Sequence, residues 1–274
     1  MRILAKIGGA ALEESGPRSE LAASVAAAVR DGHEVILVHG GGNQIRSLTG
    51  RLGIPDRYVD GLRVTDAATA EAVLCVLGGS VNRTLVAALG DAGLSAVGIT
   101  GADGASFDAR KLERGDTDLG YVGAVQHVRP ALVDTLLGAG HVPVIATVAP
   151  LAPDAEASTA GAREHLYNIN ADHAAGPLAH ALGADALLLL TDVPGVLEDE
   201  KLLPLIDPHL ASELRERGVL QGGMLPKVEA ALGCAAAAPE AQVKIAPGSG
   251  PDALRAALLP ETGTLLRGTD RARA

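Results

Sequence analysis

Two lysines occupy positions where a positive charge is costly unless an anion lies nearby. Lys6 lies within an apolar run of strand character, residues 3–7, and Lys227 lies just inside a predicted helix. An unpaired ammonium in a sheet interior is costly, and the dipole at a helix N-terminus disfavours a cation. Lys6 taken alone also fits an edge strand, from which its amine would reach solvent. Taken together, the two positions favour contact with an anionic ligand, and we interpret Lys6 as directed at a phosphate.

Glycine-rich turns follow the first two apolar runs of the chain. Gly8 and Gly9 follow the run that contains Lys6, and Gly41 and Gly42 follow a second run. Glycine turns that lead into helices expose backbone N–H groups, which bind anions. Neither turn has the Lys-Ser/Thr ending of the Walker phosphate loop, so ATP would have to be bound in another way.

Three further polar side chains are candidates for substrate contacts. Capping of a predicted helix explains Asn170 or Asp172 well, and leaves Asn168 free to contact a ligand. Arg63 precedes a helix whose predicted N-cap is Thr65, and its guanidinium could hold a carboxylate through two contacts. An isolated arginine at such a position is more often a surface ion-pair residue.

The composition argues against several classes of function. Of 274 residues, 47% are hydrophobic, with one Phe, three Tyr and no Trp, so aromatic stacking is not the main binding device. A net charge of −10 without a basic block argues against nucleic acid and anionic membranes as partners. No His or Cys residues have metal-ligand spacing, so no protein metal site is expected. Cys75 and Cys234 are predicted to be packed, reduced thiols of a cytoplasmic protein.

Strand and helix patterns alternate almost throughout, which predicts an α/β fold with a parallel sheet and helices on both faces. Gly176 and Pro177 are expected to interrupt the sixth helix of the series. Helices are predicted over residues 17–30, 43–52, 66–77, 81–89, 130–137, 171–182, 208–217, 224–238 and 252–258, and strands over 3–7, 35–39, 95–100, 141–147, 186–190, 242–246 and 264–267.

Two segments depart from this alternation. Residues 106–111 and 121–127 predict an antiparallel surface hairpin that could form a lid, and residues 149–162 predict a long loop. We expect two lobes, with the acceptor substrate and the dimer contact in residues 1–175 and the nucleotide in residues 176–274.

Seven motifs resemble, in order and spacing, those of the amino acid kinase family over nearly the whole chain. The resemblance implies a three-layer αβα sandwich with a central, mainly parallel sheet. It also implies transfer of the ATP γ-phosphoryl group to the side-chain carboxylate of N-acetyl-L-glutamate, in arginine biosynthesis, with Mg²⁺ carried on ATP. The motifs are Lys6 with Gly8-Gly9, residues 39–42, 61–65, 81–83, 168–172, 191–195 and 222–227.

The resemblance also implies a role for each candidate residue. Lys6 and Lys227 would stabilise the transition state, and Asp172 would orient both lysines. The expected acceptor contacts are Gly41, Gly42, Arg63 and Asn168, with Arg63 and Asn168 on the α-carboxylate, and the expected phosphate and ATP contacts are Gly8, Gly9, Thr191, Asp192, Gly223 and Met224.

This chemistry agrees with the residue types. A glutamate carboxylate, with a reference pKa of about 4.3, is already ionised at neutral pH, so the nucleophile needs no general base. The reaction instead needs two anions to be aligned and their charge to be neutralised.

Two alternative functions fit the sequence less well, and the family resemblance also implies an oligomeric state. A related kinase that acts on an aminoadipate bound to an acidic carrier protein fits poorly with the net charge of −10. A catalytically inactive sensor would not need to retain Lys6, Asp172 and Lys227. Arginine-inhibited members of the family have an added N-terminal helix that joins dimers into hexamers, so we expect a homodimer that arginine does not inhibit.

Overall fold

The computed structural model describes residues 1–115, 117–155 and 161–268, and its centre is an eight-stranded sheet. Neighbouring strands pair in parallel except β15 and β16, which are antiparallel. From one edge to the other, the strands are β14 (Leu205–Ile206), β16 (Thr264–Leu266), β15 (Gln242–Pro247), β11 (Ala186–Thr191), β1 (Arg2–Ile7), β2 (Glu34–His39), β8 (Val142–Ala146) and β5 (Ala96–Ile99).

Helices cover both faces of this sheet, which confirms the predicted three-layer sandwich. Alternate residues of a strand face opposite sides, so Leu4 and Ile36 belong to one core and Ile3 and Val35 to the other. The first core packs against α6 (Ala131–Gly138), α7 (Ala171–Ala181), α8 (Pro208–Glu216) and α9 (Met224–Ala237). The second packs against α1 (Ala10–Glu13), α2 (Ser15–Arg30), α3 (Gly42–Leu52), α5 (Asn82–Asp91) and α10 (Ala253–Leu258).

The predicted hairpin is present, but it is part of a second, four-stranded sheet. This sheet has the order β6 (Phe107–Lys111), β7 (Val122–Val128), β10 (Tyr167–Ile169) and β9 (Val148–Ala149). Phe107 and Ala109 of β6 are buried, so the base of the hairpin is core rather than surface. A lid role for its tip stays a prediction, and residue 116 lies outside the described residues.

Two short hairpins were not predicted from the sequence. They are β3 (Tyr58–Val59) with β4 (Leu62–Arg63), and β12 (Leu197–Glu198) with β13 (Lys201–Leu202). Each strand is too short to show an alternating pattern, so the apolar periodicity gives no signal for it.

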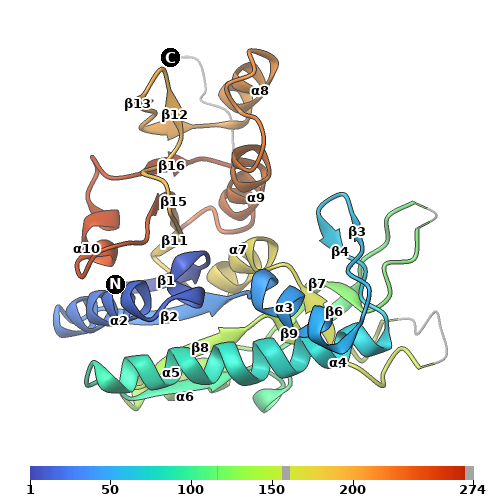
Figure 1. Cartoon of the computed structure of the whole chain (residues 1–274). Helices are drawn as coiled ribbons and strands as arrows, with labels where there is room; N and C mark the ends of the chain where they lie inside the picture. Colours follow the sequence, from blue (N-terminus) through green and yellow to red (C-terminus); the bar gives the residue numbers. More distant parts are fainter. Residues whose placement is uncertain (116, 156–160, 269–274) are drawn as a thin grey trace.

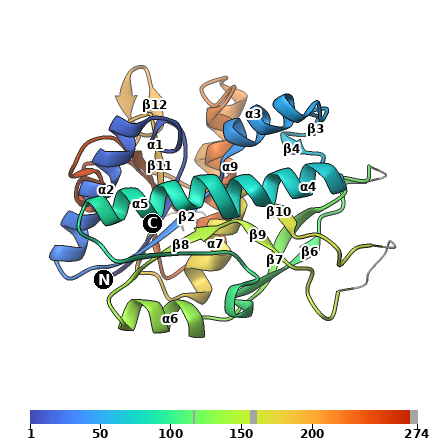
Figure 2. The same cartoon turned by 60° about the horizontal axis from the view of Figure 1, so that its bottom comes forward.

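The two helices predicted over residues 66–77 and 81–89 are in fact one continuous helical segment (Figure 2). It consists of α4 (Ala67–Leu74), a π-helical stretch (Cys75–Val81) and α5. Its N-cap is Asp66, whose side chain accepts from the Thr69 N–H, rather than Thr65, whose hydroxyl donates to the carbonyl of Arg63. Cys75 is exposed, so its predicted packing is wrong, whereas Cys234 is buried as expected.

This long segment is also the one described helix that is long and apolar enough to cross a membrane by length and composition, and 44% of its most apolar window is buried inside the protein. It packs against α2, β5 and β8. These contacts are those of a core helix of the sandwich.

Gly176 and Pro177 do not interrupt α7, contrary to the sequence-based expectation. The helix runs through both residues, and Gly176 lies against α9. A Cβ atom at Gly176 would lie 2.6 Å from the Cα atom of Cys234. The glycine is therefore required by the close approach of two helices, and it does not end either one.

The polypeptide on either side of residue 175 shares the eight-stranded sheet. Figure 1 shows β11, β15 and β16 with α8 to α10 in the upper part of the view, and α2 and α5 in the lower part. The expected boundary lies within α7, and the division of labour between two lobes stays a prediction. Of the expected loop 149–162, residues 156–160 lie outside the described residues.

Candidate active site

Two adjoining cavities lie where the glycine turns follow the strands of the central sheet. The first, of about 330 Å³, is lined among others by Gly41, Gly42, Arg63 and Asn168. The second, of about 190 Å³, is lined by Thr191, Asp192 and Lys227. Both cavities share one set of residues, which are Lys6, Gly8, Gly9 and Asp172.

Lys6 lies at this shared boundary and has a carboxylate partner. Its strand, β1, lies between β11 and β2, so the edge-strand interpretation of this lysine is wrong. The Lys6 Nζ atom lies 2.7 Å from Asp172 Oδ1. A Cβ atom at Gly8 would lie 3.2 Å from the same Nζ. The glycine therefore leaves room for the ammonium, and Asp172 offsets the cost of its partial burial.

The second glycine turn places the start of α3 at the first cavity. Gly41 is the N-cap of this helix, and no side chain caps it. Gly41 through Gln44 line the cavity. A Cβ atom at Gly41 would lie 2.8 Å from Leu77 Cδ2 in the π-helical stretch. The turn is thus packed closely against the π-helical stretch, and its uncapped N–H groups favour an anion.

Lys227 enters the second cavity from the first turn of α9. Its Nζ atom donates to Thr191 Oγ1 at 2.9 Å and lies 3.6 Å from Asp192 Oδ1. A hydrogen bond from Thr191 is the largest cause that lowers the pKa of Asp192, and a backbone hydrogen bond and the charge of Lys227 add to it. Within the described residues, Asp172 pairs with Lys6 and no ion pair joins it to Lys227.

The two other expected nucleotide contacts differ from each other in placement. Gly223 lines a third cavity, of about 700 Å³, together with Asp172 and Lys227. Met224 packs against the hydrophobic core instead. Gly223 thus lies in the same region as Lys227, whereas Met224 is not among the residues that line these three cavities, and its nucleotide contact stays a prediction.

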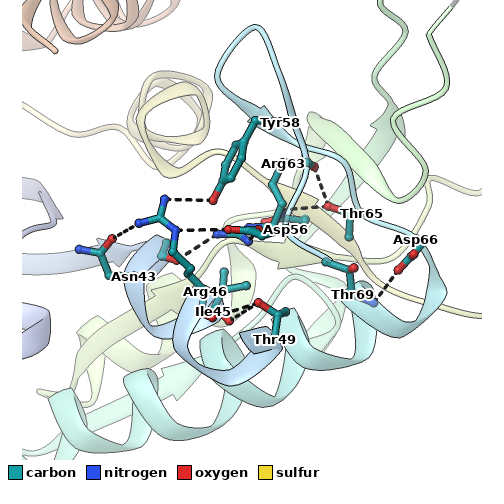
Figure 3. A network of polar contacts seen from close by, with 12 residues as sticks. Asn43, Ile45, Arg46, Thr49, Asp56, Tyr58, Arg63, Thr65, Asp66 and Thr69 are labelled. Atoms are coloured by element: carbon teal, nitrogen blue, oxygen red, sulfur yellow. Dashed lines mark hydrogen bonds and ion pairs between the residues drawn. The ribbon is translucent and has the colours of Figure 1, made fainter. Parts of the chain in front are cut away.

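Arg63 is buried, so the interpretation as a surface ion-pair residue is wrong. It is 7% exposed and lies at the end of β4, beside the first cavity. Its Nη2 donates to the Gly42 carbonyl at 3.0 Å, and its Nη1 pairs with Asp56 (Figure 3). Burial, followed by the charge of Arg46, lowers the pKa of the guanidinium.

Asn168 lies on β10, in the second sheet, and lines the same cavity as Arg63. Its Nδ2 donates to Thr65 Oγ1 at 3.4 Å. The amide and the guanidinium therefore reach one cavity from two different sheets. The pairing of polar donors with a half-apolar wall suits a small carboxylate ligand.

Three residues of this region had not been identified as candidates from the sequence. Asp56 and Arg46 form ion pairs around Arg63, and the Tyr58 ring centre lies 4.9 Å from the Arg63 guanidinium carbon. Their contacts depend on the β3–β4 hairpin, which the sequence does not reveal. An arginine, an aspartate and a tyrosine spread over residues 46–58 carry no spacing that indicates a site.

The arrangement favours charge neutralisation between two small ligands. Two ammonium groups and two glycine turns surround the junction of the cavities. Within the described residues, no group of three or more His, Cys, Asp or Glu side chains could hold a metal ion. The Cys234 thiol donates to the Asp172 carbonyl at 3.2 Å, and burial raises its pKa to about 12, so it is not a nucleophile.

Comparisons with known proteins agree with this geometry. An acetylglutamate kinase of Synechococcus sp. (strain JA-2-3B'a(2-13)) is 42% identical over 265 residues, which cover 95% of this chain and 81% of that one. An acetylglutamate kinase of Solibacter usitatus is 43% identical, with 95% and 96% coverage. The crystal structure of smu.665 from Streptococcus mutans UA159 has a TM-score of 0.78 at 32% identity and covers 97% of this chain and 98% of that one.

The model of the amino acid kinase family matches residues 1–244. The match includes both glycine turns, both lysines and Asp172. This chain belongs to the amino acid kinase family.

Proposed function

We propose that this chain is an acetylglutamate kinase, which transfers the γ-phosphoryl group of ATP to the side-chain carboxylate of N-acetyl-L-glutamate in arginine biosynthesis. The observation that carries the proposal is the junction of two cavities at Lys6 and Asp172. Relatives with 42 and 43% identity over 95% of this chain, both acetylglutamate kinases, support it.

The first cavity is the proposed acceptor site. Arg63 and Asn168 bind the α-carboxylate of N-acetyl-L-glutamate, and Gly41 and Gly42 contact the rest of the molecule. Because the buried guanidinium lies against the carbonyl of Gly42, the α-carboxylate is held close to the second glycine turn. The side-chain carboxylate then extends toward Lys6, where the cavities meet.

The second cavity is the proposed site of the ATP phosphates. Gly8, Gly9, Thr191 and Asp192 contact the nucleotide, and Lys227 approaches it from α9. Gly223 extends this surface through the third cavity. Met224, the first residue of α9, packs against the core beside Gly223 and is the remaining proposed nucleotide contact. Mg²⁺, carried on the ATP phosphates, would neutralise part of their charge without needing a protein ligand set of its own.

The residues at the junction supply alignment and charge. The acceptor carboxylate attacks as an anion, so no side chain has to remove a proton. Lys6 and Lys227 neutralise the negative charge that spreads over the transferred group, and Asp172 fixes the ammonium of Lys6. N–H groups of Gly8, Gly9 and Gly41 complete the set of donors.

The homodimer and the cytoplasmic location stay predictions.

A comparison of acceptors tests the proposed function. ADP release with hydroxylamine trapping of the acyl phosphate is measured with N-acetyl-L-glutamate, N-acetyl-L-aspartate and an N-acylated aminoadipate. We expect trapped hydroxamate with N-acetyl-L-glutamate at a kcat/KM at least tenfold above the others. A preference for the aminoadipate compound would point to the lysine-pathway kinase, and nucleotide binding without any product would point to a sensor.

A further inference from the structure

Asp56 is linked to the proposed carboxylate-binding arginine. It pairs with Nη1 of Arg63, and its other oxygen, Oδ2, lies 3.2 Å from Nε of Arg46 (Figure 3). Both oxygens of this carboxylate are therefore engaged by arginines. The Asp56 side chain is 23% exposed, while that of Arg63 is 5% exposed. The aspartate is thus the main charge partner of a guanidinium that is nearly removed from water.

Arg63 and its partner Asp56 differ in their position relative to the first cavity. Arg63 and Tyr58 line it, whereas Asp56 and Arg46 are not among its lining residues. Asp56 therefore contacts the guanidinium without itself lining the cavity. An aspartate that competed with a ligand carboxylate would have to lie on the cavity side.

Asp56 also connects Arg63 to the helix that follows the second glycine turn. Arg46 belongs to α3, and its Nη1 donates to Oδ1 of Asn43, a residue that lines the cavity. Its Nη2 lies 3.4 Å from the Tyr58 hydroxyl. Through these contacts the short β3–β4 hairpin, which carries Arg63, is fixed against the start of α3.

We propose that Asp56 is a positioning residue, which fixes the Arg63 guanidinium for the α-carboxylate of the acceptor. This inference rests on the proposed function, in which Arg63 binds that carboxylate. A guanidinium offers five N–H donors in one plane. With Nη1 held by Asp56 and Nη2 by the Gly42 carbonyl, rotation of the plane is blocked and the remaining donors point in fixed directions.

The test compares two ligands, one with the α-carboxylate and one without it. 4-Acetamidobutyrate is N-acetyl-L-glutamate with hydrogen in place of the α-carboxylate, so its inhibition constant does not report on Arg63. We expect Asp56→Ala to raise the KM for N-acetyl-L-glutamate about tenfold, the effect of losing one charged hydrogen bond. The inhibition constant of 4-acetamidobutyrate should change less than about twofold and kcat less than about threefold.

An intermediate variant and a matched control accompany Asp56→Ala. Asp56→Asn keeps an acceptor for Arg63, so we expect a KM between wild type and Asp56→Ala, and it also serves if the alanine variant does not fold. Asp31→Asn is the matched control, because Asp31 accepts from Arg255 at 2.6 and 2.7 Å in a pair whose residues do not line the three cavities described above. This control should leave both constants unchanged.

Three outcomes overturn the inference. An unchanged KM in both Asp56 variants removes the positioning role, and a lowered KM shows that Asp56 competes with the ligand. A parallel rise of the KM and of the 4-acetamidobutyrate inhibition constant shows a general loosening of the cavity.

Arg63→Lys tests the proposed function separately. If it raises both constants equally, Arg63 does not bind the α-carboxylate and the proposed acceptor site fails. If it raises only the KM while Asp56→Ala does not, the inference alone fails.

Discussion

At the scale of single residues, the sequence identified candidate site residues better than it identified their contacts and burial. Lys6, Asp172 and Lys227, which the motifs single out, line two adjoining cavities, and their catalytic roles stay predictions. Asp172 was expected to orient Lys227 as well as Lys6, whereas Lys227 donates to Thr191, a contact that depends on where packing places α9 relative to the end of β11. The burial of Arg63 was missed for a similar reason, since a two-residue strand determines it. Motif spacing thus identifies candidate residues, and packing determines their partners.

Lys227 provides the most direct test at this scale. We expect Lys227→Ala to lower kcat by about 10²- to 10³-fold, because a charge that stabilises the transferred phosphoryl group is lost. The KM for N-acetyl-L-glutamate should change little, since Lys227 does not line the acceptor cavity. Steady-state kinetics with ATP and acceptor varied separately measure both quantities. Full activity in this variant would refute the two-lysine mechanism.

At the scale of elements, the periodic segments were predicted well and their junctions were not. The apolar runs of β1, β2 and β11 and the helical pattern of α9 match the structure within a few residues. The sequence predicts a break between residues 77 and 81, because Gly78 and Gly79 are usual helix-ending residues, whereas the structure continues through a π-helical stretch there. Pro177 was read as an interruption for the same kind of reason. Local propensity fails where tertiary packing stabilises an unfavourable residue.

The packing of α7 against α9 predicts a stability effect at Gly176. Alanine there would place its Cβ 2.6 Å from the Cys234 Cα, so we expect Gly176→Ala to reduce the free energy of unfolding by about 1–3 kcal/mol. Gly90 is the matched control, because it lies in α5, is exposed, and has nothing within 4 Å of the added Cβ. Gly90→Ala should be stabilising by up to about 1 kcal/mol. Urea unfolding measures both, and equal effects would contradict the close helix contact.

His39, at the end of β2, predicts a pH dependence of stability. Burial lowers its pKa from 6.5 to about 4. Nδ1 donates to the Gly40 carbonyl and Nε2 accepts from Asn82, which requires the neutral ring. Because the unfolded chain binds the proton more tightly, this residue destabilises the fold as pH falls from above 6.5 toward 4. The expected loss between pH 7.5 and pH 5 is about 2 kcal/mol.

A comparison of variants isolates this effect from other titrations. His39→Gln should lose about 2 kcal/mol less than wild type over the same pH interval, as measured by chemical unfolding at each pH. His180→Gln, at an exposed position in α7, controls for the substitution itself. Identical pH profiles for His39→Gln and wild type would show that His39 is not held neutral by its burial.

At the scale of the whole molecule, the alternation of strands and helices was enough to predict a parallel α/β sandwich. The sequence did not reveal that the sheet is continuous through both halves, because strand order depends on crossovers that have no local pattern. β1 pairs with β2 on one side and with β11 on the other, so the first strand of the chain joins the two halves. This position places Lys6 between the proposed acceptor and nucleotide sites, and it makes the sheet rather than a linker the element that aligns them.

Phosphorus NMR of the purified chain with Mg²⁺-ATP and N-acetyl-L-glutamate tests the central claim most directly. We expect the γ-phosphate signal of ATP to fall while an acyl phosphate signal rises in step with ADP, and only when both substrates are present. Consumption of ATP with release of inorganic phosphate alone, or no consumption by a folded chain that binds both ligands, would contradict it.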